Sequence, residues 1–88
     1  MVKGVTKSGF EFEVREDVAD DMKVLRAMRK ARKDGTYFDE AIELILGEEQ
    51  TEKLYDHLEK KEGRATTAAA DREITEIVTF AGEDAKNS

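Results

Sequence analysis

The chain has 88 residues, of which 41% are charged, and its formal net charge is −6. It contains no cysteine, which excludes disulfides and thiolate metal sites, and no stretch approaches the roughly 20 apolar residues that a membrane span needs. The negative charge disfavours general nucleic-acid binding, and because a domain this small buries only a modest core, we expect it to gain from forming a homo-oligomer.

The N-terminal segment, residues 2–14, is predicted to be a short β-hairpin. Phe10, Phe12 and Val14 alternate with two glutamates, which indicates a strand with one apolar and one solvated face. Residues 7–9 supply the turn, and a weaker apolar stretch before them supplies the first strand. Because two strands alone are barely stable, we expect the aromatic face to pack on helices.

Four helices are predicted after the hairpin, and glycines mark their ends. Gly35, Gly47, Gly63 and Gly82 each follow an apolar pattern of helical period, as glycine often does at a helix C-terminus. The chain is therefore expected to be mainly α, a small four-helix domain with a short N-terminal β-hairpin. This single domain should span residues 1–82, with helices at about 17–33, 36–46, 48–61 and 67–81 and a disordered tail at 83–88.

The first helix carries a concentration of positive charge. Six basic residues and no acidic one lie between Lys23 and Lys33. Val18, Met22, Leu25 and Met28 repeat at helical spacing, and Leu25 and Met28 should face the core with Val24 and Ala31, roughly opposite the cations. The basic face could be a solvated surface, or it could bind an acidic protein or a nucleic-acid backbone; a membrane is disfavoured because the helix has no aromatic anchor. The candidate partner-binding residues are Lys23, Arg26, Arg29, Lys30 and Lys33.

Residues suited to catalysis or metal binding are poorly placed. His57 has Lys53 and Lys61 one helical turn away on either side, and these lysines would repel a metal ion and offer no ligand. We therefore expect a solvated histidine, and with one histidine so placed no Ser/His/Asp set is credible. The glycines never approach a phosphate-loop spacing. The sequence predicts no enzyme activity, no catalytic residue, no cofactor and no metal.

Several short motifs in a fixed order resemble one known family, the small tail assembly chaperones of long-tailed bacteriophages and prophages of Gram-positive bacteria. The resemblance covers nearly the whole chain, from Ser8 to about Phe80. The motifs are Ser8-Gly9-Phe10-Glu11-Phe12-Glu13, Leu46-Gly47-Glu48-Glu49-Gln50, Leu54-Tyr55-Asp56-His57-Leu58, Glu62-Gly63-Arg64 and Glu73-Ile74-Thr75-Glu76-Ile77.

The resemblance implies a role in phage tail morphogenesis. Such a protein binds the tape measure protein, keeps it soluble and helps subunits of the major tail (tube) protein polymerise around it. It would act in the cytoplasm of the bacterial host and be absent from the mature virion. Many genes of this family also yield a longer product by ribosomal frameshifting, and this chain would be the short form. Two alternatives stay open: a small nucleic-acid-binding phage regulator that uses the basic first helix, and a structural head–tail component.

Overall fold

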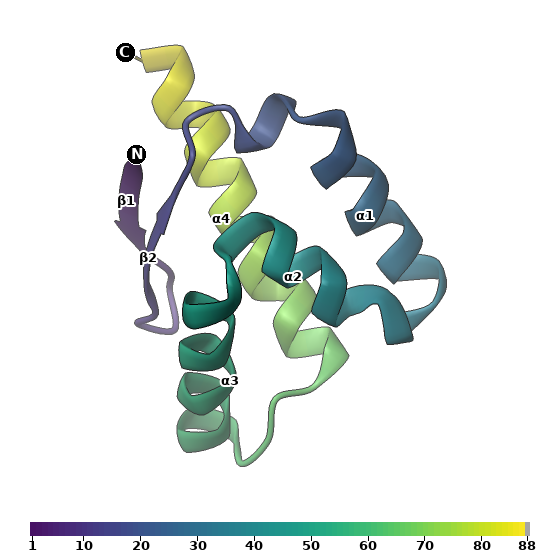
Figure 1. The fold of residues 1–88 in the computed structure, drawn as a ribbon. Coiled ribbons are helices and arrows are strands. Elements are labelled where there is room, and N and C mark those ends of the chain that lie inside the picture. Colours follow the sequence, from purple (N-terminus) through teal and green to yellow (C-terminus); the bar gives the residue numbers. More distant parts are fainter. Residues whose placement is uncertain (88) are drawn as a thin grey trace.

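The structure, a computed structural model, describes residues 1–87. Within this range an antiparallel hairpin precedes four α-helices, which confirms the predicted mainly helical class. Figure 1 shows the hairpin on one side of the molecule and the first α-helix on the other. In chain order the elements are β1 (Val2–Val5), β2 (Glu11–Val14), the 3₁₀ turn η1 (Val18–Asp20), α1 (Met22–Lys33), the 3₁₀ turn η2 (Gly35–Tyr37), α2 (Phe38–Leu46), α3 (Glu48–Glu62) and α4 (Thr67–Asn87).

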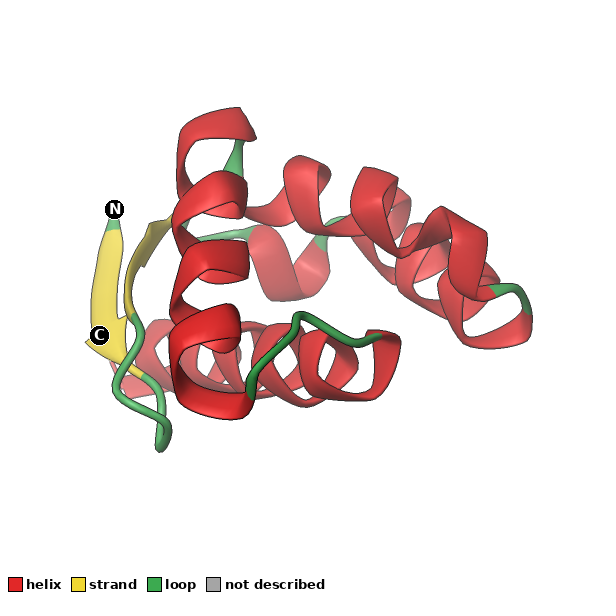
Figure 2. Ribbon diagram, turned by 90° about the horizontal axis from the view of Figure 1, so that it is seen from below, coloured by secondary structure: helices red, strands yellow, loops and turns green. Residues whose placement is uncertain are grey.

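The hairpin packs its aromatic face on the helices, as its alternation predicts. The strands pair antiparallel with Gly4 opposite Phe12, and the side chains of Phe10, Phe12 and Val14 are buried. Phe12 meets Phe80 of α4 edge to face, with ring centroids 5.6 Å apart. Figure 2 shows the two strands at one end of the molecule, with the helices forming the rest.

Gln50, near the start of α3, holds the outer edge of β2. Its side-chain Oε1 accepts the backbone N–H of Glu13 at 2.8 Å, and its Nε2 donates to the Glu13 carbonyl, also at 2.8 Å. A single amide thus satisfies both backbone groups that a third strand would otherwise pair, and a short two-stranded sheet gains a fixed position against a helix.

The first helix begins at Met22, not at residue 17 as predicted. Residues 18–20 form the 3₁₀ turn η1, and the extended residue Asp21 caps α1 by accepting the backbone N–H of Lys23 at 2.8 Å. Arg15 donates to the same carboxylate at 3.0 Å, and its hydrogen bond together with the cap lowers the pKa of Asp21. Asp21 therefore separates α1 from η1, and the face that α1 buries differs from the one expected for a single continuous helix.

The second helix is also preceded by a 3₁₀ turn. Residues 35–37 form η2, capped by Asp34, and α2 proper begins at Phe38 rather than at residue 36. Gly47, with φ of 83°, then separates α2 from α3, and α3 runs to Glu62, one residue beyond its predicted end. The predicted helix end at Gly47 is therefore confirmed, and this single residue joins α2 to α3.

The fourth helix crosses the molecule and contacts α2, β1 and η1. The predictions that it ends near residue 81 and that a disordered tail follows are wrong for residues 83–87, which are helical; Ser88 lies outside the described residues. Gly82 does not end the helix. Instead it allows α4 to pack closely on η1, since a Cβ at this position would lie 3.1 Å from the Cβ of Ala19. The glycine lets α4 approach η1 and continue past it.

Candidate protein-binding surface

All five candidate partner-binding residues lie exposed on α1. We call Lys23, Arg26, Arg29, Lys30 and Lys33 the basic stripe. Lys23, Arg26 and Lys30 border a shallow hollow with Tyr37 and Glu40, and the Lys30 ammonium lies 4.1 Å from the centre of the Tyr37 ring.

The sixth cation of the helix is engaged within the fold. Arg32 binds Asp71 at 3.1 Å and donates to Thr75 of α4 at 2.8 Å, which ties the C-terminal half of α1 to α4. By contrast, within residues 1–87 no member of the basic stripe makes an ion pair. The stripe therefore carries positive charge that no ion pair of the described residues neutralises, although Lys30 packs on the Tyr37 ring and Glu40 borders the same hollow.

Leu25 was expected to face the core but is exposed, and so is the neighbouring apolar residue Met22. The helix buries Val24, Met28 and Ala31, whereas Met22 is 67% and Leu25 is 40% exposed. The reason is that α1 starts later than predicted, after the cap residue Asp21. The face that α1 turns to the core then contains residues 24, 28 and 31, which are spaced i, i+4 and i+7. Met22 and Leu25 each lie one turn before an arginine of the basic stripe, so that surface is apolar as well as positive.

A second charged surface, of opposite sign, lies on α2 and α3. We call it the acidic patch; its members are Asp39, Glu40, Glu43, Glu48 and Glu52, and none of them makes an ion pair with any described residue. Leu44 lies among them on α2 and is 41% exposed. Both charged surfaces therefore contain exposed apolar side chains.

Burial, together with the neighbouring negative charges, raises the pKa of two groups at the acidic patch. Desolvation raises the pKa of Glu43, and the neighbouring charges of Asp39, Glu48, Glu52 and Glu40 raise it further. Desolvation and a hydrogen bond donated to Asp39 likewise raise the pKa of the Tyr55 phenol. Binding of a partner that supplies cations would therefore be electrostatically favourable at this cluster of carboxylates.

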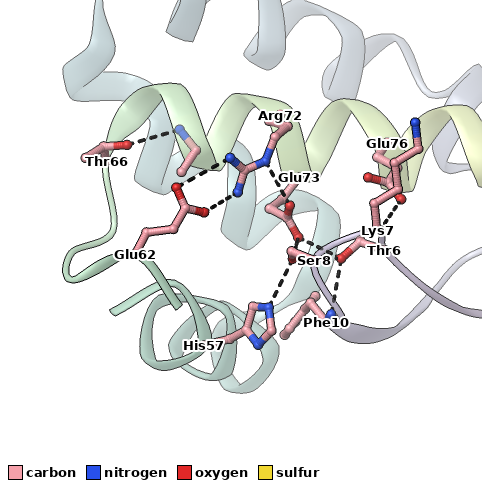
Figure 3. Close-up of polar contacts among 11 residues, drawn as sticks. Thr6, Lys7, Ser8, Phe10, His57, Glu62, Thr66, Arg72, Glu73 and Glu76 are labelled. Carbon is pink, nitrogen blue, oxygen red and sulfur yellow. Dashed lines mark hydrogen bonds and ion pairs between the residues drawn. The ribbon is translucent and has the colours of Figure 1, made fainter. Parts of the chain in front are cut away.

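A polar network lies beneath the hairpin turn, centred on a glutamate that was not among the predicted site residues (Figure 3). The buried Glu73 carboxylate accepts hydrogen bonds from the hydroxyls of Thr6 at 2.8 Å and Ser8 at 2.9 Å. Arg72 donates to its other oxygen at 3.2 Å and binds Glu62, which lowers the pKa of Glu62. The signal for Glu73 was present in the sequence, since its position, three residues after Ala70 and four before Ile77, is on the apolar face of α4.

His57 belongs to the same network, so the prediction of a solvated histidine is wrong. Its ring is half-buried against Phe10, with centroids 5.7 Å apart, and its Nε2 lies 3.0 Å from the Ser8 hydroxyl. Because that hydroxyl donates its proton to Glu73, the Nε2–H of His57 is the donor to Ser8. In a catalytic triad the histidine lies between serine and acid and accepts the serine proton, whereas here Ser8 lies between His57 and Glu73. These hydrogen bonds tie the hairpin turn to α3 and α4.

The described residues offer little else for chemistry. No group of three or more histidine, cysteine, aspartate or glutamate side chains among residues 1–87 is arranged to hold a metal ion. Nor does that part of the chain contain a helix both long enough and apolar enough to cross a bilayer. A comparison with protein-family models, curated proteins and solved structures finds no match to this chain.

Proposed function

We propose that this chain is a tail assembly chaperone of a long-tailed phage or prophage of a Gram-positive bacterium. It binds the tape measure protein and promotes assembly of the major tail protein into a tube around it. The observation that carries the proposal is the order and spacing of the sequence motifs between Ser8 and Phe80. The protein acts in the host cytoplasm and is left out of the mature virion.

The composition of the basic stripe supports a protein partner over a nucleic acid. Met22 and Leu25 lie exposed among its cations, and protein interfaces combine apolar contacts with charged groups in this way. A phosphate backbone needs no apolar contact, and the acidic remainder of the chain would repel it. We assign the five cations of the basic stripe to binding a protein partner.

Co-expression with a tape measure protein, the expected partner, tests the proposal. We expect the tape measure protein to remain in the soluble fraction and to co-purify with the tagged chain, because the chaperone covers apolar helical surface that otherwise aggregates. Expression of the tape measure protein alone, or with an unrelated acidic protein of similar size, is the control and should leave it insoluble.

Two results would replace the proposal with an alternative. Detection of the chain by mass spectrometry in purified virions would indicate a structural head–tail component. Salt-sensitive binding to DNA, without co-purification of the tape measure protein, would indicate a nucleic-acid-binding regulator.

A further inference from the structure

The two edges of the β-hairpin differ in whether a third strand can join them. Glu13 turns its backbone N–H and C=O away from β1, as its two hydrogen bonds with Gln50 show. Because Lys3 pairs with Glu13 across the hairpin, it turns its own backbone groups to the opposite edge, and Val5 does the same. Gln50 therefore interrupts the edge of β2. On the edge of β1, no hydrogen bond from any described residue reaches the outward groups of Lys3 and Val5.

The next outward group along the edge of β1 is already bound by α4. Lys7 lies two residues after Val5, and its backbone N–H donates to the Glu76 carboxylate at 2.7 Å. Phe80 follows Glu76 by one helical turn and lies against Gly4, where a Cβ would be 3.0 Å from its ring. Phe80 is nevertheless 39% exposed, and Val5 is 56% exposed. The open part of the edge therefore ends at Glu76 and has a partly exposed aromatic ring on its core-facing side.

We propose that the free edge of β1 binds an extended segment of a partner protein, which joins the hairpin as a third strand. The backbone of this segment pairs with the outward N–H and C=O groups of Lys3 and Val5. Extended backbone offers matching groups at two-residue spacing, whereas a helix uses its backbone groups internally. The third strand also gives the sheet the minimum number of strands that is stable in water with an apolar face.

The surroundings of the edge define the side chains of the segment. Its side chains alternate between the two faces of the sheet, and the one beside Gly4 lies over the exposed part of Phe80, so an apolar residue fits there. Two residues away on the same face the neighbours are carboxylates: Glu76 at one end and the exposed Glu83, one turn beyond Phe80, at the other. The segment is therefore apolar at its centre and basic two positions away on each side. The residues between lie beside Lys3 and Val5 on the outer face, where uncharged side chains fit.

A different protein is favoured over a second copy of this chain. In the β1 strand of a second copy, the core-facing residue between Lys3 and Val5 is Gly4, which offers Phe80 no side chain to pack against. Figure 1 shows the hairpin and α1 on opposite sides of the molecule, so an occupied edge leaves the basic stripe accessible. The edge is thus a second interaction surface, and its test requires no tape measure protein.

Titration of a capped pentapeptide, Lys-Thr-Val-Thr-Lys, into the isotope-labelled chain tests the proposal by NMR. We expect the amide signals of Lys3 and Val5 to shift and to exchange more slowly with solvent, because both N–H groups gain acceptors. The amide of Glu13 is an internal control that should not respond, because Gln50 already binds it.

Two control peptides separate backbone pairing from charge. The same peptide with both threonine nitrogens methylated loses the donors that face β1, and we expect it to bind about tenfold more weakly or worse. Glu-Thr-Val-Thr-Glu keeps those donors but places like charges beside Glu76 and Glu83, and it should also bind more weakly than the basic peptide.

Two variants of the chain probe the same edge. Val5→Pro removes only an outward N–H, which is where an edge strand accepts proline, and should weaken binding of the basic peptide about tenfold or more. Val5→Ala keeps that N–H and should bind nearly as the original chain does. Circular dichroism melts check that both variants fold, and the methylated peptide decides the question if Val5→Pro does not.

Three results would overturn the proposal. The first is an absence of peptide-dependent shifts at Lys3 and Val5 at the highest attainable peptide concentration. The second is equal binding of the methylated and unmethylated peptides, since backbone pairing would then contribute nothing. The third is a shift of the same amides with protein concentration alone, which would make a second copy the occupant.

Discussion

Replacing Phe12 with alanine should lower the free energy of unfolding by about 3–5 kcal/mol. The Phe12 side chain is 4% exposed and meets Phe80 edge to face, so its loss removes both buried apolar area and the contact that joins the hairpin to α4. For a domain of this size each kcal/mol corresponds to roughly 4–8 °C in melting temperature, so a thermal melt detects the change easily.

The matched control is Val5→Ala, on the neighbouring strand. Val5 is 56% exposed, so its truncation removes little buried area and should leave the melt nearly unchanged. A Phe12→Ala variant that melts with the original chain would contradict the packing of the hairpin on α4.

Replacing Glu73 with alanine should cost about 2–4 kcal/mol, because the hydroxyls of Thr6 and Ser8 lose a charged acceptor. Glu73→Gln keeps one side-chain oxygen for these hydroxyls and should be milder. Urea unfolding of both variants measures the difference, and combining Glu73→Ala with Thr6→Val should cost less than the two single changes summed.

An exposed glutamate of the same helix provides the comparison. Glu83→Ala should change the free energy of unfolding by less than about 0.5 kcal/mol. Equal stabilities for Glu73→Ala and the original chain would show that the network beneath the turn contributes nothing to the fold.

Local periodicity predicted well which segments form helices and strands. It predicted less well which face of a helix is buried. The strict alternation of residues 10–14 defines a strand in any context, and the pattern before Gly47 defines a helix end. The apolar residues at 18, 22, 25 and 28 suggested one continuous helix, but Asp21 interrupts it with a cap that periodicity alone does not reveal. The prediction therefore placed Leu25 in the core, although Leu25 and Met22 are both exposed.

The remaining misses depend on contacts between residues far apart in the chain. Gly82 resembles a helix stop until Ala19 is known to pack against it, and His57 appears solvated until the turn at Ser8 is placed beside it. The basic stripe was predicted because its residues are adjacent in sequence. Its apolar component was missed, because the exposure of Leu25 follows from how α1 packs in the fold.

The attachment of the hairpin to the last helix has a consequence for the order of folding. Its anchors join residues far apart in the chain, from Glu13 to Gln50 and from Thr6 to Glu73. An isolated two-stranded hairpin is marginally stable in water, and closing such long loops is slow. During synthesis the strands are made first and their contacts with α4 form last. A chain truncated after Arg64 keeps Gln50 but loses Glu73 and Phe80, so we expect it to show no stable hairpin cross-peaks by NMR. Until α4 has left the ribosome, Phe12 remains accessible to cellular chaperones.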